Sequence, residues 1–313
     1  MRSWTRGFVT DKALTVGPVA PARTAARPAS THAWYVDVWI QMLRRKPLGT
    51  IGGAIVLVML LAAVGAEVLT PYGFTQTSLL DRFIFASKAH WLGTDQLGRD
   101  LLTRLIYGAR VSLYVGFGAV ALGSALATLV GIFSAYFGGR ADLWIQRGVD
   151  AWMAFPPLLL LMSIMSLVGP SVWNITLVLG VAFGIQNSRV VRGVALSIKE
   201  HTFIESARAA GAGHGRITAT HIFPNVLPTI IVVATTGLST VILTEASLSF
   251  LGLGVPPPYP TWGGMLSLAG LDHMYQAPWL AIWPAVALSL AVFGFNMLGD
   301  ALRDLLDPRL KGR

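Results

Sequence analysis

The sequence lacks cysteine altogether and is poor in charged residues. None of its 313 residues is cysteine, which excludes disulfides and thiolate chemistry. Asp, Glu, Lys and Arg make up only 12% of the chain, whereas a soluble domain averages about 25%. Because so few charges cannot cover the surface of a soluble protein of this size, the composition predicts a chain embedded in membrane lipid.

Catalytic and ligand-binding motifs are also missing. There is no G-x-x-x-x-G-K-[ST] segment to hold ATP phosphates, no H-E-x-x-H zinc motif and no G-x-S-x-G element for acyl transfer. His214 and His221 are predicted to be loop residues. The net charge of +9 lies beside apolar runs rather than in one stripe, which argues against nucleic-acid binding. The sequence therefore predicts no enzyme, and no metal or cofactor on this chain.

Five long segments contain no Asp, Glu, Lys or Arg. A helix needs about 20 apolar residues to cross a hydrocarbon core of about 30 Å. One of the segments is too long for one crossing and carries Gly169-Pro170-Ser171 near its middle, so we interpret it as two short spans joined by a turn. The sequence predicts an all-α membrane protein with about six transmembrane helices, in the charge-free segments 48–66, 111–139, 151–188, 217–244 and 274–299.

The distribution of basic residues predicts the orientation. With both termini inside, the cytoplasmic segments 1–46, 140–150, 189–216 and 301–313 together hold 19 of the 24 Lys and Arg residues. Cytoplasmic loops are enriched in Lys and Arg, so the N- and C-termini are predicted to be cytoplasmic. The predicted parts are a mobile cytoplasmic tail (1–35), an interfacial helix and first span (36–70), an external segment (71–110), a core domain (111–300) and a cytoplasmic C-terminal tail (301–313).

The fifth predicted span carries hydroxyls and one acid. The candidate lining of a translocation path is Thr236, Ser239, Thr240 and Glu245. Such hydroxyls also bond back to carbonyls of their own helix, and the pattern leaves both interpretations open. A carboxylate within a span is costly, so Glu245 is expected to face protein or water, either on the path or at the end of the span.

A short helix is predicted in the cytoplasmic segment 200–224. Thr202 and Glu205 form a T-x-x-E capping box, so a helix should begin at Phe203. Gly211 is where a left-handed cap would end it. The result is a helix of about two turns that offers Phe203, Ile204 and Ala207 to a partner.

This segment resembles the Glu-Ala-Ala loop of permeases in ATP-binding-cassette importers. The pattern is Glu205-x-Ala207-x3-Gly211, followed after twelve residues by Pro224, with Ser206 in place of the usual alanine. In that family the loop forms a coupling helix that sits in a groove of the ATPase subunit. The resemblance assigns this coupling role to Phe203, Ile204, Glu205, Ala207, Arg208 and Gly211.

Three further motifs are similar to the dipeptide/oligopeptide/nickel branch and to its second, C-type permease. They are an external signature with Gly93, Asp95, Gly98, Arg99 and Asp100, the stretch Glu245–Gly254, and the tail Gly299–Arg309. The resemblance implies a type I importer permease fold in the cytoplasmic (inner) membrane, in contact with lipid. It also implies a second homologous permease, two ATPase subunits that bind ATP and Mg²⁺, and an external solute-binding protein.

The resemblance predicts import of dipeptides or oligopeptides by alternating access. Nickel or another small solute handled by the same branch is the first alternative. An ion-coupled secondary transporter is the alternative from another class, but it would usually show an inverted repeat and acidic residues near mid-span. We find no convincing case of either in the sequence.

Overall fold

The computed structural model describes residues 46–267 and 272–306, and within these ranges the chain is helical apart from loops and an isolated bridge between Thr94 and Asp100. The predicted tail 1–35, the interfacial helix before Lys46 and the end of the C-terminal tail lie outside the described residues. The elements are α2 (Pro47–Val64), α3 (Ala66–Leu69), η1 (Leu79–Asp81), α4 (Leu101–Phe137), α5 (Gly139–Met153), α6 (Pro157–Val168), α7 (Val172–Lys199), α8 (Thr202–Ala209), α9 (His214–Ile217), η2 (Thr218–Ile222), α10 (Phe223–Phe250), α11 (Trp262–Leu266) and α13 (Trp279–Leu306).

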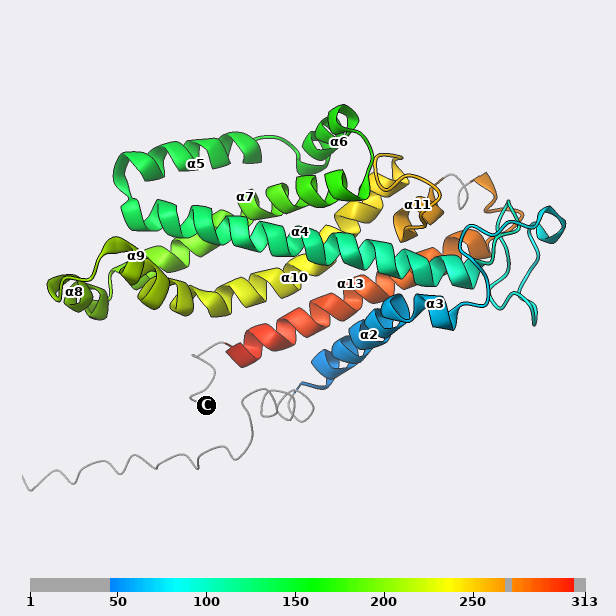
Figure 1. Ribbon diagram of the computed structural model, residues 1–313, viewed down its shortest axis with the longest axis horizontal. Helices are drawn as coiled ribbons and strands as arrows, with labels where there is room; N and C mark the ends of the chain where they lie inside the picture. Colours follow the sequence, from blue (N-terminus) through cyan, green and yellow to red (C-terminus); the bar gives the residue numbers. More distant parts are fainter. Residues whose placement is uncertain (1–45, 268–271, 307–313) are drawn as a thin grey trace, which may run out of the picture.

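Long helices run along one another in an elongated bundle (Figure 1). By length and hydropathy, four helical stretches of the described chain can each cross a membrane: α2, α4, the continuous stretch His214–Phe250 and α13. The pair α5 and α6, bent by 89° at the break between them, makes a fifth if it counts as one span. These four or five apolar spans compare with the six that were predicted. The helix α7 is long enough but carries polar residues such as Asn187 and Arg192.

The region predicted as two short spans is divided unequally. The turn at Gly169–Ser171 is where the sequence placed it, between the end of α6 and the start of α7. However, α6 has 12 residues and α7 has 28, so the prediction that both are short is wrong for α7. Charged residues ended the predicted span at Ser188, but α7 continues to Lys199 because α4 packs along it and carries it beyond the apolar run.

Small residues bring α4 and α7 into close contact. A Cβ atom added at Gly123 would lie 2.6 Å from the carbonyl oxygen of Gly180, and one at Gly131 would lie 2.7 Å from that of Ser188. Neither position can hold a larger side chain without moving backbone. Lipid tails are as apolar as the helix side chains, so the hydrophobic effect gives no driving force for helices to associate in a membrane. Close packing of this kind supplies that driving force instead.

The start of α4 differs from the predicted start of the second span. The helix begins at Leu101, ten residues before the charge-free run, and includes Arg104 and Arg110. With 37 residues it is about 55 Å long at 1.5 Å per residue. Segment 71–100 therefore lies at one end of α4, which we call the α11 end, and α8 lies at the other, the α8 end (Figure 1).

The outside of the bundle is apolar. Val58 and Leu129 are each more than half exposed, although they lie well inside the long helices α2 and α4. Exposed apolar surface of this extent is typical of a protein in contact with lipid or with other membrane subunits. The buried core follows the contacts between α4, α7, α10 and α13.

Candidate coupling segment and membrane cavity

The short helix predicted at the α8 end is present, but its start differs from the prediction. Helix α8 includes Thr202, and its N-cap is His201, which makes no side-chain cap bond. The carbonyl of His201 instead accepts a hydrogen bond from the Ile204 N–H at 3.0 Å. The predicted capping box of Thr202 and Glu205 is therefore wrong, because the helix begins one residue earlier and its first turn closes through backbone atoms.

The end of α8 follows the prediction. Gly211 has a φ of +80°, in the left-handed region that favours glycine. The Ala212 N–H donates to the Ala207 carbonyl at 3.0 Å, and the Gly211 N–H donates to the Arg208 carbonyl at 2.9 Å. These two bonds form a Schellman motif that caps the last turn, so α8 is a helix of eight residues with a defined end.

The helix α8 has one face toward the protein and one toward solvent. Ile204 is fully buried among Ile198, Ile217 and Ile222, and Ala207 is half-buried against the same cluster. The prediction that α8 offers Ile204 to a partner is wrong, since this side chain anchors the helix to its own chain. Helix α8 projects from the end of the bundle (Figure 1), and its residues Phe203, Glu205 and Arg208 are exposed.

Two side chains, one in α8 and one in α9, contact Tyr136 at the end of α4. The Tyr136 hydroxyl lies 2.6 Å from Nδ1 of His214, and the Arg208 guanidinium lies over the Tyr136 ring at 5.8 Å from its centroid. His214 belongs to α9 and His221 to η2, so the prediction that both are loop residues is wrong. The chain then runs through Pro224 directly into α10, which gives the segment a continuous helical connection to a long span.

At the α11 end, the predicted external signature forms a closed network of hydrogen bonds. Asp95 is buried, and its Oδ1 accepts from the backbone N–H groups of Leu97 and Arg99 at 2.8 and 3.0 Å. Its Oδ2 accepts from Nε of Arg99 at 2.6 Å and lies 3.6 Å from Nε of Arg104. Gly98 turns the chain with a φ of +69°, so the signature residues hold one tight turn together.

Asp100 connects this turn to α4. It is the N-cap residue of α4, and its Oδ2 accepts from the Thr103 N–H at 2.8 Å. Its Oδ1 lies 3.0 Å from Nδ1 of His90, which is buried with it. Gly93, at a φ of +87°, accepts the Leu101 N–H at 3.0 Å. The five signature residues therefore shape the entry into α4.

The polar residues of α10 have different environments. Glu245 is fully buried, and its carboxylate accepts from the hydroxyls of Ser112 at 3.1 Å and Ser249 at 2.7 Å, which joins α10 to α4. Ser239 is also buried and donates to Asn296 on α13 at 2.7 Å. Thr236 donates back to the Val232 carbonyl of its own helix at 2.9 Å. Glu245 thus faces protein, and bonding to the same helix explains Thr236.

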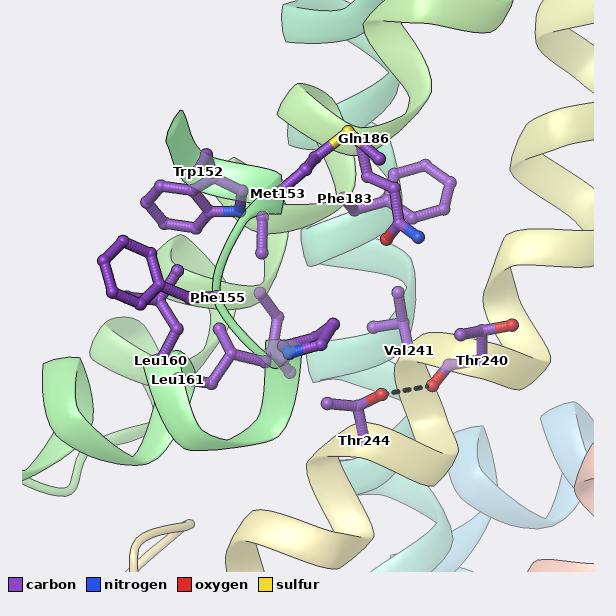
Figure 2. Close-up of a pocket in the computed structure, with 13 residues that line it drawn as sticks. Trp152, Met153, Phe155, Leu160, Leu161, Phe183, Gln186, Thr240, Val241 and Thr244 are labelled. Atoms are coloured by element: carbon purple, nitrogen blue, oxygen red, sulfur yellow. Dashed lines mark hydrogen bonds between the residues drawn. The ribbon is translucent and has the colours of Figure 1, made fainter. Parts of the chain in front are cut away.

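A cavity of about 240 Å³ lies where the break between α5 and α6 meets α7 and α10. Of the four predicted path residues, only Thr240 lines it. Figure 2 shows Trp152, Phe155 and Leu160 on the α5–α6 side, with Gln186 and Thr240 on the opposite walls. Sequence reasoning missed Gln186, whose only signal was a pair of amides, Gln186-Asn187, inside a charge-free run.

An all-helical bundle with an apolar outside and a short capped helix projecting from one end defines a transmembrane permease component. The profile described as the inner membrane component of binding-protein-dependent transport systems matches residues 127–312, and that of the N-terminal transmembrane domain of oligopeptide transport permease C matches residues 34–86. The chain belongs to this family of inner-membrane transport permeases. It is a multi-pass membrane protein and a transport component rather than an enzyme.

Two relatives cover nearly all of the chain. The dipeptide transport system permease protein DppC of Alkalihalophilus pseudofirmus is 41% identical over 297 residues, which are 94% of this chain and 97% of that protein. The glutathione transport system permease protein GsiD of Pectobacterium atrosepticum is 38% identical over 312 residues, 99% of this chain and 100% of that protein.

A solved structure of the MetNI methionine ABC transporter has a chain with the same fold. The TM-score is 0.53 at 20% identity, over 65% of this chain and 96% of that one.

Proposed function

We propose that this chain is one permease subunit of an ATP-driven importer that carries dipeptides or oligopeptides across the cytoplasmic membrane by alternating access. The names of its relatives support the substrate class: one is a dipeptide permease, one a glutathione permease, and one from Brucella suis a peptide permease. Glutathione is itself a tripeptide derivative, so the three names share the chemistry of a short peptide.

The proposed complex contains a second homologous permease, two ATPase subunits and an external solute-binding protein. The family description itself includes dependence on a binding protein. The chain has no P-loop, so ATP and Mg²⁺ would bind to the separate ATPase subunits. Both termini and α8 would face the cytoplasm, in agreement with the excess of Lys and Arg in those segments.

The observation that carries the coupling role is the geometry of α8. This helix is rigid because Ile204 anchors it and Gly211 caps it, while Phe203, Glu205 and Arg208 remain exposed at the end of the bundle. A rigid projecting helix can move together with a partner that grips it. Because α8 connects through α9 and η2 to α10, closure of the ATPases would tilt this span as a rigid body.

Charge reversal on the exposed face of α8 tests this role. We expect Glu205→Lys to abolish peptide uptake and to prevent co-purification of the ATPase subunits, while the chain still inserts into the membrane. The matched control is Glu200→Lys, which makes the same change at an exposed residue between α7 and α8. Normal uptake by Glu205→Lys, at wild-type membrane levels, would disprove the coupling role.

A further inference from the structure

The cavity at the break between α5 and α6 contains two polar side chains without partners. Neither the Gln186 carboxamide nor the Thr240 hydroxyl has a hydrogen-bond partner among the described residues. Each lies near the middle of a 28-residue helix, Gln186 on α7 and Thr240 on α10. In hydrocarbon such groups find no partner, and polar residues at this depth face the bundle interior or a water-filled cavity. This wall therefore does not face lipid in the assembled transporter.

The break that forms the opposite wall has a local cause. Pro156-Pro157 follows α5, and proline can neither donate a backbone hydrogen bond nor continue the helix before it. The chain bends by 89° and α6 begins in a new direction. Irregular backbone in a membrane protein is found where it is buried in protein or lines a cavity. Here it carries Phe155 to the cavity, and Trp152 in the last turn of α5 lines the same wall.

The lining has the chemistry of a site for an uncharged part of a peptide. None of the described residues that line the cavity is charged. A carboxamide offers one donor group and one acceptor, and a peptide group needs one of each. The apolar and aromatic wall opposite can cover a side chain. The volume of about 240 Å³ is below the 300–1,000 Å³ of a complete ligand pocket, so the cavity holds a portion of a peptide.

We propose that this cavity is a contact site for the transported substrate, in which Gln186 and Thr240 hydrogen-bond to a peptide group while Trp152 and Phe155 cover an adjacent side chain. The inference rests on the proposed function, because it takes the substrate to be a peptide. It assigns to Gln186 a role in selecting substrates with an amide backbone.

The absence of cysteine from the chain gives a direct test, because one introduced cysteine is then unique in it. We would assemble Gln186→Cys and Thr240→Cys with the partner permease, the ATPases and the binding protein. A charged thiol reagent, sulfonatoethyl methanethiosulfonate, is then applied at rest and during turnover. We expect both cysteines to react, and alanyl-alanine delivered by the binding protein to slow the reaction about tenfold. Stimulation of ATP hydrolysis by the loaded binding protein checks that each variant is assembled.

The matched control is Leu177→Cys on the opposite side of α7. Residue 177 precedes residue 186 by nine positions, which at 100° per residue places it half a turn away. It is exposed and lines a separate apolar groove with Leu122 and Trp173. We expect no reaction at this position. No reaction at Gln186→Cys, reaction without protection by the dipeptide, or equal protection of Leu177→Cys would each overturn the proposal.

Uptake separates this proposal from the proposed function. We expect Gln186→Leu to lower kcat/KM for uptake of alanyl-alanine about tenfold, since an unpaired peptide group then remains in the cavity. If the wild type takes up the dipeptide but Gln186→Leu does so equally well, only the cavity assignment fails. If the wild type takes up no peptide, the proposed function fails and the cavity assignment fails with it.

Discussion

Segment 200–211 at the α8 end and segment 90–100 at the α11 end are both short and polar and contain left-handed glycines, but their polar side chains lie in opposite environments. Asp95 and Asp100 are buried, and their carboxylate oxygens are bonded within the chain. Glu205 and Arg208 are exposed, and Glu205 forms no side-chain hydrogen bond or ion pair with another described residue. The two ends are separated by the length of α4.

This difference distinguishes a motif that shapes its own chain from one that is available to another chain. The acids of the α11 end cap α4 and close a turn. Their buried carboxylates are therefore not available to a partner. At the α8 end, a buried isoleucine holds the helix, and Glu205 is exposed without a side-chain partner among the described residues. Substitutions should therefore affect stability at the α11 end and coupling at the α8 end.

The largest effect on stability is expected for Asp95→Ala. This change leaves the Arg99 guanidinium and two backbone N–H groups without their acceptor in a buried site, at a cost of about 3–5 kcal/mol. Limited proteolysis of residues 71–100 and thermal unfolding in detergent measure it. Glu67→Ala is the control, because its exposed ion pair with Arg110 contributes about 0–1 kcal/mol. Equal losses in the two variants would contradict the contrast between buried and exposed acids.

A second comparison uses neighbouring residues on α8. Ile204→Ala removes the buried anchor and should weaken the docking of α8 by about 2–5 kcal/mol, seen as faster amide exchange over residues 202–209. Phe203→Ala should leave exchange within about 0.5 kcal/mol of wild type, because this ring is 42% exposed, yet it should reduce binding of the ATPase. The opposite ranking of the two variants in amide exchange would show that the assignment of faces is wrong.

The smallest effect is expected at the end of α8. Gly211→Ala places a Cβ atom in the left-handed region and should cost about 1 kcal/mol, although no atom lies within 4 Å of that position. Gly213→Ala is the control, since Gly213 has a φ of −69° and equally open surroundings. Amide exchange at Ala212 reports the loss of the cap. Similar exchange in the two variants would mean that the backbone conformation of Gly211 does not hold the end of α8.

The sequence predicted the helical elements more accurately than their boundaries. Long charge-free runs located α2, α4, α10 and α13, and glycine located the end of α8. The start of α4 at Leu101 was missed because Arg104 and Arg110 interrupt the apolar pattern, although in the fold each pairs with a nearby acid. The apolar pattern predicts which residues can lie in lipid. The ends of a helix depend instead on backbone hydrogen bonds and on the neighbouring elements that pack against it.

The candidate sites show the same division. The residues of α8 and of the external signature were named from local motifs, since each motif is a contiguous turn or helix. The cavity was not found, because its walls come from the break after α5, from α7 and from α10. Ser112 could not be paired with Glu245 for the same reason, as 133 positions separate them in the sequence.

The sequence by itself determined that this chain is a helical membrane permease, and it located the short helix α8 and its glycine cap. Hydropathy and local motifs depend only on residues that are close together in the sequence, so they can be recognised before the tertiary structure is known. Only the tertiary structure decided which faces are buried: Ile204 and Glu245 point inward, while Phe203 and Gln186 remain accessible. The physical reason is that burial depends on which helices pack against each other, and in this chain those helices are far apart in the sequence.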